Sequence, residues 1–204
     1  MEAAKTFEAF NYFIFDLDNT LYNEEDFLFF AYYKIGKYVW AKNNIEPETV
    51  SDYLTDEFRK QGRDNIFQKL NKRFSLNINV AEYLNILRNS IAEDIALYDI
   101  YYKIFEQLKS RNSKIYIITN GTPVQQQNKI KSINWKGFDK NIKFYFANEY
   151  APKPEAEALN KIIRENNLDR YKTLFIGDSQ TDFDCALNAG VSFMYNYQFE
   201  KLWK

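Results

Sequence analysis

Short apolar runs that end in polar residues recur along the chain and predict the strands of a sheet. One such run covers Tyr12–Asp16, and further runs alternate with helical patterns from about position 114 onward. The predicted strands there are Lys114–Thr119, Ile142–Ala147, Thr173–Gly177 and Val191–Tyr195, and the predicted helices between them are Val124–Lys131, Glu155–Asn166 and Thr181–Asn188. Because strands that alternate with helices form βαβ units, the pattern predicts an α/β fold with a mainly parallel, five-stranded sheet.

The stretch from position 22 to 98 has a different pattern, with helical periodicity and no convincing strand. Its predicted helices are Asp26–Lys42, Pro47–Gln61, Asp64–Phe74 and Val80–Asp94, with Pro47 in a first turn and Asn79 as an N-cap. A connection of this length is too long for a crossover loop. It therefore predicts an α-helical domain at 22–98, inserted into a core formed by 1–21 and 99–204.

Aromatic residues are dense at the start of this predicted insertion. Aromatics at helical spacing usually form a core, and that is the main interpretation here. Tyr22, Phe27 and Phe30 follow the two aspartates closely in sequence. We therefore keep these three residues as candidate substrate contacts, with packing inside the insertion as the alternative.

Composition excludes several kinds of chemistry. The chain contains no His, which rules out Ser-His-Asp hydrolysis, His-ligated zinc and phosphohistidine chemistry. Its single Cys, Cys185, allows neither an internal disulfide nor a Cys-rich metal site, and we expect it to pack against the sheet. Catalysis would therefore depend on Asp, Glu, Lys, Ser, Thr, Tyr or a bound ion.

Charge and hydropathy bear on location and partners. The formal net charge is −1, with basic residues scattered along the chain, so we expect neither nucleic acid nor a membrane surface as partner. The N-terminal residues lack the apolar region of a signal peptide, and no apolar run approaches the ~20 residues that span a bilayer. The expected location is the cytoplasm. The sequence does not predict an oligomeric state.

Polar residues follow four of the predicted strands. They are Asp16 and Asp18 after the first strand, Thr119-Asn120-Gly121 after the second, Lys153 in the loop after the third, and Asp178 and Asp182 after the fourth. Carboxyl ends of parallel strands meet at one edge of a sheet, where ligands bind in open α/β folds. The topology therefore predicts that these residues converge.

The converging residue types suit phosphoryl transfer. Carboxylates without His form a hard oxygen site that favours Mg²⁺ over zinc. A Thr hydroxyl, backbone N–H groups and a Lys ammonium suit the phosphoryl oxygens. An Asp beside the metal can act as nucleophile, and a second Asp two residues later lies on the same side of the extended chain. That second Asp can protonate the leaving oxygen and then deprotonate water.

Four segments together resemble the ordered motifs of the haloacid dehalogenase-like hydrolase superfamily. They are Asp16-Leu17-Asp18-Asn19-Thr20, Thr119-Asn120-Gly121, Lys153, and Gly177-Asp178-Ser179-Gln180-Thr181-Asp182. The resemblance covers almost the whole chain, and the insertion at 22–98 is similar to the helical cap of cap-type-one members. The family implies a Rossmann-like three-layer core and a mobile turn after Thr20.

The resemblance also implies roles for single residues. Asp16 would be the nucleophile and a Mg²⁺ ligand, Asp18 the acid/base and a ligand through its carbonyl, and Asp178 a further ligand. Thr119 and the amides of Asn120 and Gly121 would bind the phosphoryl group, and Lys153 would neutralise charge. Asp182 would be either another ligand or a residue that orients waters or Lys153. Ser179 is expected to cap the following helix.

The function favoured by these residues is a Mg²⁺-dependent phosphatase that acts on a small phosphorylated metabolite, either a nucleotide or a sugar phosphate, through an aspartyl-phosphate. A phosphomutase of the same superfamily is the main alternative, because it shares the two aspartates. A carbon–halogen hydrolase is disfavoured, since that branch typically lacks the acid/base corresponding to Asp18. A non-catalytic binding protein is disfavoured because every residue of catalytic type is present.

Overall fold

The computed structural model describes residues 7–203, which form two compact units. The larger, here called the sheet unit, contains the described residues up to Asn23, Ala96–Gln126, and those from Ile133 onward. The smaller, here called the helical unit, contains Glu24–Ile95 and Gln127–Ser132. Helix α7 (Pro123–Ser132) thus contributes its first residues to the sheet unit and its last residues to the helical unit.

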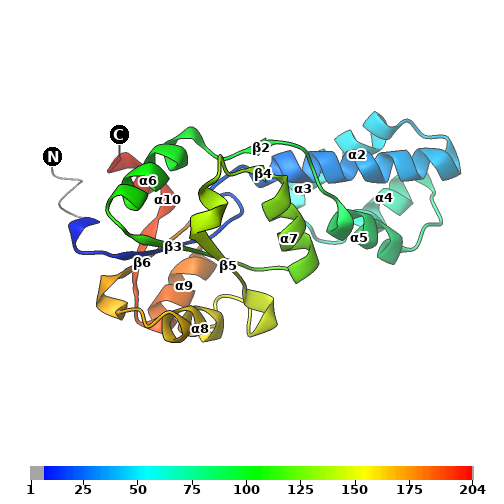
Figure 1. The fold of residues 1–204 in the computed structure, drawn as a ribbon. Helices are drawn as coiled ribbons and strands as arrows, with labels where there is room; N and C mark the ends of the chain where they lie inside the picture. The colour runs from blue at the N-terminus through cyan, green and yellow to red at the C-terminus, as the bar shows by residue number, and fades with distance from the viewer. Residues whose placement is uncertain (1–6, 204) are drawn as a thin grey trace. The chain divides into compact units, whose positions relative to one another are not determined.

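The sheet unit is built on five parallel strands (Figure 1). They are β1 (Tyr12–Phe15), β3 (Lys114–Thr119), β5 (Ile142–Phe146), β6 (Thr173–Gly177) and β7 (Ser192–Tyr195), in the spatial order β5-β3-β1-β6-β7. Phe15 lies beside Ile117 of β3 and Ile176 of β6, so β1 is central. The α/β fold with a five-stranded parallel sheet predicted from the sequence is confirmed.

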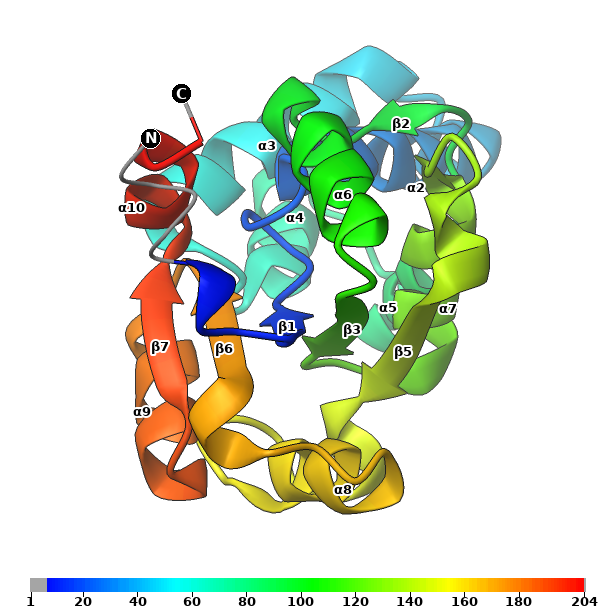
Figure 2. The same ribbon diagram turned by 60° about the vertical axis from the view of Figure 1, so that its left-hand side comes forward.

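Helices cover both faces of this sheet, which explains why the central strands β1 and β6 are buried almost throughout rather than alternating. Ile14 belongs to a core cluster with residues of α8 (Glu157–Glu165) and α9 (Gln180–Ala189), and Cys185 lies in that cluster as expected. Phe15, on the opposite face, packs edge to face against aromatics of α6 (Asp99–Ser110) and α10 (Asn196–Lys201). Figure 2 shows the ribbons of α6 and α10 on one side of the sheet and those of α8 and α9 on the other. The result is the three-layer, Rossmann-like arrangement.

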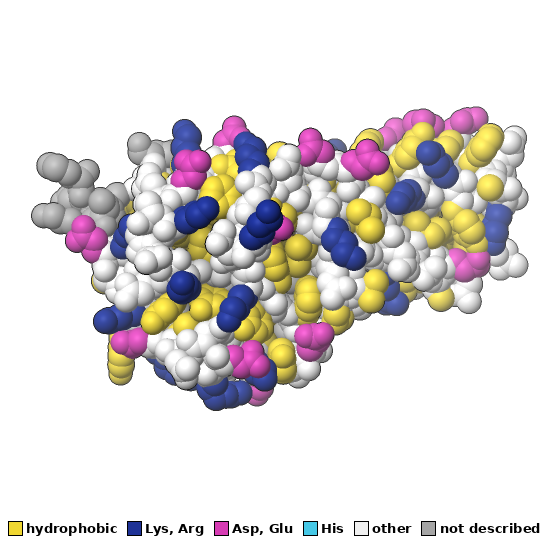
Figure 3. Space-filling view, viewed as in Figure 1, with side chains coloured by type: hydrophobic (Ala, Val, Ile, Leu, Met, Phe, Trp, Pro, Cys, Tyr) yellow, Lys and Arg dark blue, Asp and Glu magenta, His cyan; other side chains and the backbone are white. Residues whose placement is uncertain are grey.

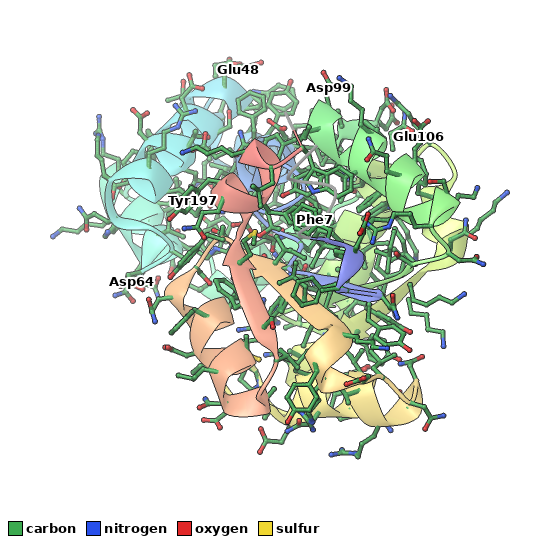
Figure 4. All side chains as sticks on the ribbon, turned by 90° about the vertical axis from the view of Figure 1, so that its left-hand side faces the viewer. Phe7, Glu48, Asp64, Asp99, Glu106 and Tyr197 are labelled. Atoms are coloured by element: carbon green, nitrogen blue, oxygen red, sulfur yellow. The ribbon has the colours of Figure 1, made fainter. Side chains whose placement is uncertain are left out.

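Aromatic rings fill much of the layer beneath α6 and α10. Phe7 packs against Phe199 with ring centroids 5.0 Å apart, and Phe105 lies 5.6 Å from Phe15. Figure 4 shows Phe7 near α10, whereas Asp99 and Glu106 lie on the outer side of α6. Helix α6 therefore presents an apolar side to the sheet and a charged side to solvent.

The helical unit consists mainly of α2 (Glu24–Asn43), α3 (Pro47–Gln61), α4 (Ile66–Phe74) and α5 (Val80–Asn89). Helix α5 begins at a capping box, in which the Asn79 side chain accepts from the Ala81 N–H while the Glu82 carboxylate accepts from the Asn79 N–H. The end of α7 joins these helices through Asn128, which donates to the Arg88 carbonyl over 2.8 Å, and through the Lys129–Glu24 ion pair. The assignment of this short segment to the helical unit was not predicted.

Two predictions for the insertion were wrong in detail. The helix predicted to reach Asp94 ends at Asn89, because Ser90 turns to an extended backbone and its hydroxyl donates to the Ile86 carbonyl. A short strand, β2 (Ile95–Ala96), then pairs with β4 (Ile133–Asn134), in a stretch where no strand was expected. A two-residue strand depends on a partner distant in sequence, so it leaves no periodicity to detect.

The sequence did not predict several elements of the sheet unit. These are helices α6 and α10 and the 3₁₀ turns η1 (Phe138–Asn141), η2 (Ala147–Glu149) and η3 (Arg170–Lys172). Within residues 7–203, none of the helices combines the length and the apolar character needed to cross a membrane.

Gly36 allows α2 to approach the start of α3 closely. An added Cβ would lie 2.8 Å from the Pro47 Cα and closer still to its carbonyl oxygen. Glycine to alanine in a helix interior normally stabilises by about 1 kcal/mol. We predict that Gly36→Ala instead lowers the free energy of unfolding by about 1–3 kcal/mol, because the backbone at Pro47 must move to make room for the added Cβ. Urea unfolding followed by helical circular dichroism measures the change.

Lys37→Ala is the matched control, because Lys37 is the exposed neighbour on the same helix. It should change the stability by less than about 0.5 kcal/mol. An unchanged or raised stability in Gly36→Ala would contradict the close approach of the two helices.

Candidate active site

Asp16 is the first residue after β1, and its side chain is only 8% exposed. The apolar run of β1 places it at the carboxyl edge of the sheet. The Lys153 ammonium donates to one of its carboxylate oxygens, and the Thr20 hydroxyl lies 3.3 Å from the other. Burial is the main influence on this carboxyl, and it raises the pKa of Asp16 above its usual range while Lys153 opposes the increase.

Lys153 is buried between two carboxylates. Its ammonium donates to Asp16 and, over 2.6 Å, to Asp182. Burial by itself would lower the pKa of Lys153, but these two acidic neighbours raise it above the ordinary value. Lys153 therefore remains charged, and it links the end of β1 to the start of α9.

Asp182 has both carboxylate oxygens engaged. One accepts from Lys153, and the other accepts from the Ser179 hydroxyl at 2.6 Å and the Ser179 N–H at 3.2 Å. Ser179 is the N-cap of α9, as the sequence predicted, and Asp182 completes a capping box. The Asp182 side chain lies over Gly177, where an added Cβ would come within 2.6 Å of it. This geometry fits a residue that orients Lys153.

Thr20 joins the carboxylates that follow two different strands. Its hydroxyl lies 3.3 Å from Asp16 and 3.2 Å from Asp178, and its side chain is fully buried. A hydroxyl carries one proton, so it can donate to only one of the two acids at a time. Sequence reasoning used Thr20 as part of a motif but did not assign it this bridging position.

Carboxylate oxygens of Asp16, Asp178 and Asp182 all lie within 4.8 Å of one another. Lys153 is the cation that contacts Asp16 and Asp182, so the cluster carries more negative than positive charge. Burial, followed by the nearby Asp182 charge, raises the pKa of Asp178 as well. A compact cluster of oxygen donors with surplus negative charge suits a hard divalent cation.

Asp18 is half-buried and contacts Tyr22. The Tyr22 hydroxyl donates to its carboxylate over 2.6 Å, and the two residues also form a backbone bridge. The Tyr22 ring is fully buried. The residue that the sequence offered as a substrate contact is thus placed on the predicted acid/base, where it orients the carboxyl group.

The loop after β3 is tied to the Lys153 loop by Asn120. Its side-chain amide donates to the Lys153 carbonyl, and its side-chain oxygen accepts from the Lys153 N–H, both over 2.9 Å. This reciprocal pair positions the backbone of Lys153. The sequence assigned only the Asn120 backbone to the site, so its side chain is a contribution that was missed.

The other two residues of this loop have partners within the sheet unit. The buried Thr119 hydroxyl lies 3.3 Å from the side-chain oxygen of Gln126, the last residue of α7 counted in the sheet unit. Gly121 has a φ of 123°, which favours glycine, and its N–H donates to the Asn148 side chain over 2.8 Å. Gln126 and Asn148 lie outside the motifs, and no local signal identified them.

The structure therefore brings Asp16, Lys153, Asp178 and Asp182 into direct or close contact at one edge of the sheet, with Asn120 bonded to Lys153. Phe27 and Phe30 belong to the helical unit. There Phe27 is fully buried, and the Lys34 ammonium lies 4.6 Å from the centre of the Phe30 ring. Contact between these two aromatics and a substrate remains a prediction.

Comparison with solved structures shows which proteins share this fold. A candidate HAD-hydrolase, YfnB from Bacillus subtilis, bound to magnesium, matches with 20% identity and a TM-score of 0.65, over 91% of this chain and 86% of that one. A HAD phosphatase from Thermococcus onnurineus matches with 18% identity and a TM-score of 0.58, over 91% and 85%. A candidate β-phosphoglucomutase from Thermotoga maritima matches with 12% identity and a TM-score of 0.66, over 94% and 97%.

Comparison of the sequence with known proteins and families gives one match, to a family model. No curated protein matches the chain. The family model described as haloacid dehalogenase-like hydrolase matches residues 13–195, from the first strand to the last. That span contains all four motifs and the whole carboxylate cluster. The chain therefore belongs to the haloacid dehalogenase-like hydrolases.

Proposed function

We propose that this hydrolase is a Mg²⁺-dependent phosphatase that transfers the phosphoryl group of a small metabolite to Asp16. The observation that carries the proposal is the buried Lys153 ammonium shared between Asp16 and Asp182, beside Asp178. A nucleophilic carboxylate must approach an anionic phosphoryl group, and a fixed cation next to it reduces the repulsion. If Lys153 served only to balance the charges of Asp16 and Asp182, the third carboxylate, Asp178, would not be needed beside them.

Asp16, Asp178 and the Asp18 carbonyl would hold the metal ion. The donor set fits Mg²⁺, because it consists of oxygens with surplus negative charge and no nitrogen or sulfur ligand. When bound, the ion supplies positive charge against the phosphoryl oxygens and the attacking carboxylate. Asp182 has both oxygens occupied by Lys153 and Ser179, so we assign it to positioning rather than to ligation.

The proposed reaction has two steps. In the first, a carboxylate oxygen of Asp16 forms a bond to phosphorus, the ester P–O bond breaks, and Asp18 gives its proton to the leaving oxygen. In the second, Asp18 takes a proton from water as the water oxygen attacks phosphorus. Phosphate leaves, and Asp16 is regenerated as the carboxylate. Tyr22 holds Asp18 in position through its 2.6 Å hydrogen bond.

The β3 loop would bind the transferred group. The Thr119 hydroxyl and the Asn120 N–H are the donors that we assign first. The Gly121 N–H is bonded to Asn148, so it becomes available only when that side chain moves.

The substrate proposed here is small, either a nucleotide or a sugar phosphate. A phosphomutase is distinguished by its product, because it returns the phosphoryl group to a second hydroxyl of the sugar instead of to water.

Removal of the nucleophile gives the first functional prediction. Asp16→Asn should reduce phosphate release by about 10³-fold or more across a panel of nucleotides and sugar phosphates assayed with Mg²⁺. The substitution removes one charge from a crowded acidic cluster and leaves Lys153 paired with Asp182, so the melting temperature should not fall. Hydrolysis that persists in this variant would rule out transfer to Asp16.

Removal of the metal ion gives the second functional prediction. Excess EDTA should abolish phosphate release, and added Mg²⁺ should restore it, because the surplus negative charge of the cluster opposes an anionic substrate. Zn²⁺ should restore less activity than Mg²⁺, since the donors are all oxygen. Full turnover in EDTA would be incompatible with the assigned ligands.

The Tyr22–Asp18 hydrogen bond gives the third functional prediction. Tyr22→Phe should lower kcat about tenfold or more and leave KM nearly unchanged, because a hydrogen bond to a charged group contributes about 1.5–3 kcal/mol. A raised KM with an unchanged kcat would indicate instead that the Tyr22 hydroxyl contacts substrate. Steady-state kinetics on the best substrate of the panel separates the two outcomes, and Tyr171→Phe, at a 91% exposed tyrosine, is the matched control.

A further inference from the structure

A cavity of about 650 Å³ opens at the edge of the sheet opposite to Asp16. Its lining includes the first residues of three strands, Tyr12 of β1, Lys114 of β3 and Ile142 of β5. Asp16 follows the last residue of β1, so at about 3.3 Å per residue the two edges lie roughly 13 Å apart. The cavity lies entirely within the sheet unit and is separate from the carboxylate cluster.

The charge around this cavity is strongly positive. Lys109, Lys114, Lys140 and Lys143 line it, against a single acidic residue, Glu165. The Glu165 carboxylate is paired with Lys161, one turn earlier on α8, at 2.5 Å. Its charge is thus already partly balanced, and the lysines create a positive potential at the cavity.

Three of these lysines have no partner of their own. Within the part of the chain that the structure describes, Lys109, Lys114 and Lys140 form no side-chain hydrogen bond or ion pair. Several other lysines, such as Lys42, Lys69 and Lys161, pair with carboxylates. Unpaired ammonium groups around one concave surface are available for an anion.

The fourth lysine is held in place. The Lys143 ammonium donates to the Asn166 side-chain oxygen over 2.6 Å, and the Asn166 amide donates in turn to the Tyr145 hydroxyl and the Ile162 carbonyl, each over 2.8 Å. Asn166 is thereby fixed in orientation and fixes Lys143. A preorganised donor loses less conformational entropy when it binds a ligand.

The floor of the cavity is apolar and aromatic. Phe105 and Tyr116 are almost fully buried there, and Tyr12 and Phe138 are half-buried. Ring faces accept a planar group by stacking, and asparagine amides such as those of Asn112 and Asn141 can bond to its edge. Figure 3 shows dark blue side chains around a yellow surface in this part of the sheet unit.

We infer that this cavity is a second binding site, for a small polyanion that carries a planar ring, the chemical class of a nucleoside diphosphate. The lysines bind the phosphates, and the ring lies against the half-buried Phe138. The volume is within the range of small-molecule sites, about 300–1,000 Å³. Ligands of open α/β folds ordinarily bind at the carboxyl ends of the strands, so this site is not the one that the fold supplies.

The test is isothermal titration calorimetry of the full chain with ADP, in EDTA without Mg²⁺. The variant Lys114→Glu/Lys140→Glu should weaken binding at least about tenfold, because two charge-assisted contacts become repulsive. The control Lys103→Glu/Lys131→Glu makes the same change of net charge at two exposed lysines that do not line the cavity. It should change the Kd less than about twofold, and added salt should weaken binding to the unmodified protein.

Two results of the ADP titrations would overturn the inference. One is the absence of binding at about 1 mM ADP, a concentration at which even weak sites fill. The other is an equal effect of the two double variants, which would place ADP at another site, including the Asp16 cluster. Pyrophosphate should bind more weakly than ADP. Equal affinity would show that the ring makes no contact, and it would refute the assigned ligand class. Thermal unfolding of both double variants checks that the fold is intact.

Discussion

The ion pairs of the buried Lys153 ammonium with Asp16 and Asp182 are the interactions around which the carboxyl edge of the sheet is organised. A charged group away from water is costly unless it is paired, so the two buried carboxylates both depend on the Lys153 ammonium, which in turn needs at least one of them. The pairing brings together a strand end, a loop and a helix start that are far apart in sequence. Breaking it by removing Lys153 would leave two carboxylates buried beside Asp178 without their cation.

Local backbone features make this pairing possible. Gly177 leaves room for the Asp182 side chain, and Ser179 fixes that side chain through the capping box of α9. The Asn120 side chain accepts from the N–H of Lys153 and donates to its carbonyl. These contacts define the position of the Lys153 backbone and of one of its two carboxylate partners.

The parallel sheet explains why polar groups gather at its two edges. Both faces are covered by helices, so the side chains of β1 and β6 must be apolar along their length, and only the strand ends are free for polar residues. One edge collects carboxylates around a buried lysine. The other collects lysines around an aromatic floor. The two edges therefore have opposite electrostatic character within a single sheet.

The sequence by itself determined the five strands of the sheet and the four charged residues, Asp16, Lys153, Asp178 and Asp182, that gather at its carboxyl edge. Continuous apolar runs specified the strands, and Lys114–Thr119 and Thr173–Gly177 were located to the residue. The absence of His and the order of the motifs specified an acidic oxygen site. This succeeded because strand period, capping residues and residue chemistry are local properties.

Only the tertiary structure decided the contacts between those residues. That Thr20 lies between Asp16 and Asp178, that Tyr22 bonds to Asp18, and that Asn120 holds Lys153 all depend on how distant segments meet. The same holds for the early end of α5 and the β2–β4 pair, whose partners are far away in sequence. The lysine cavity has no sequence signature either, since its lysines come from a helix, a turn and two strands that only the sheet brings together.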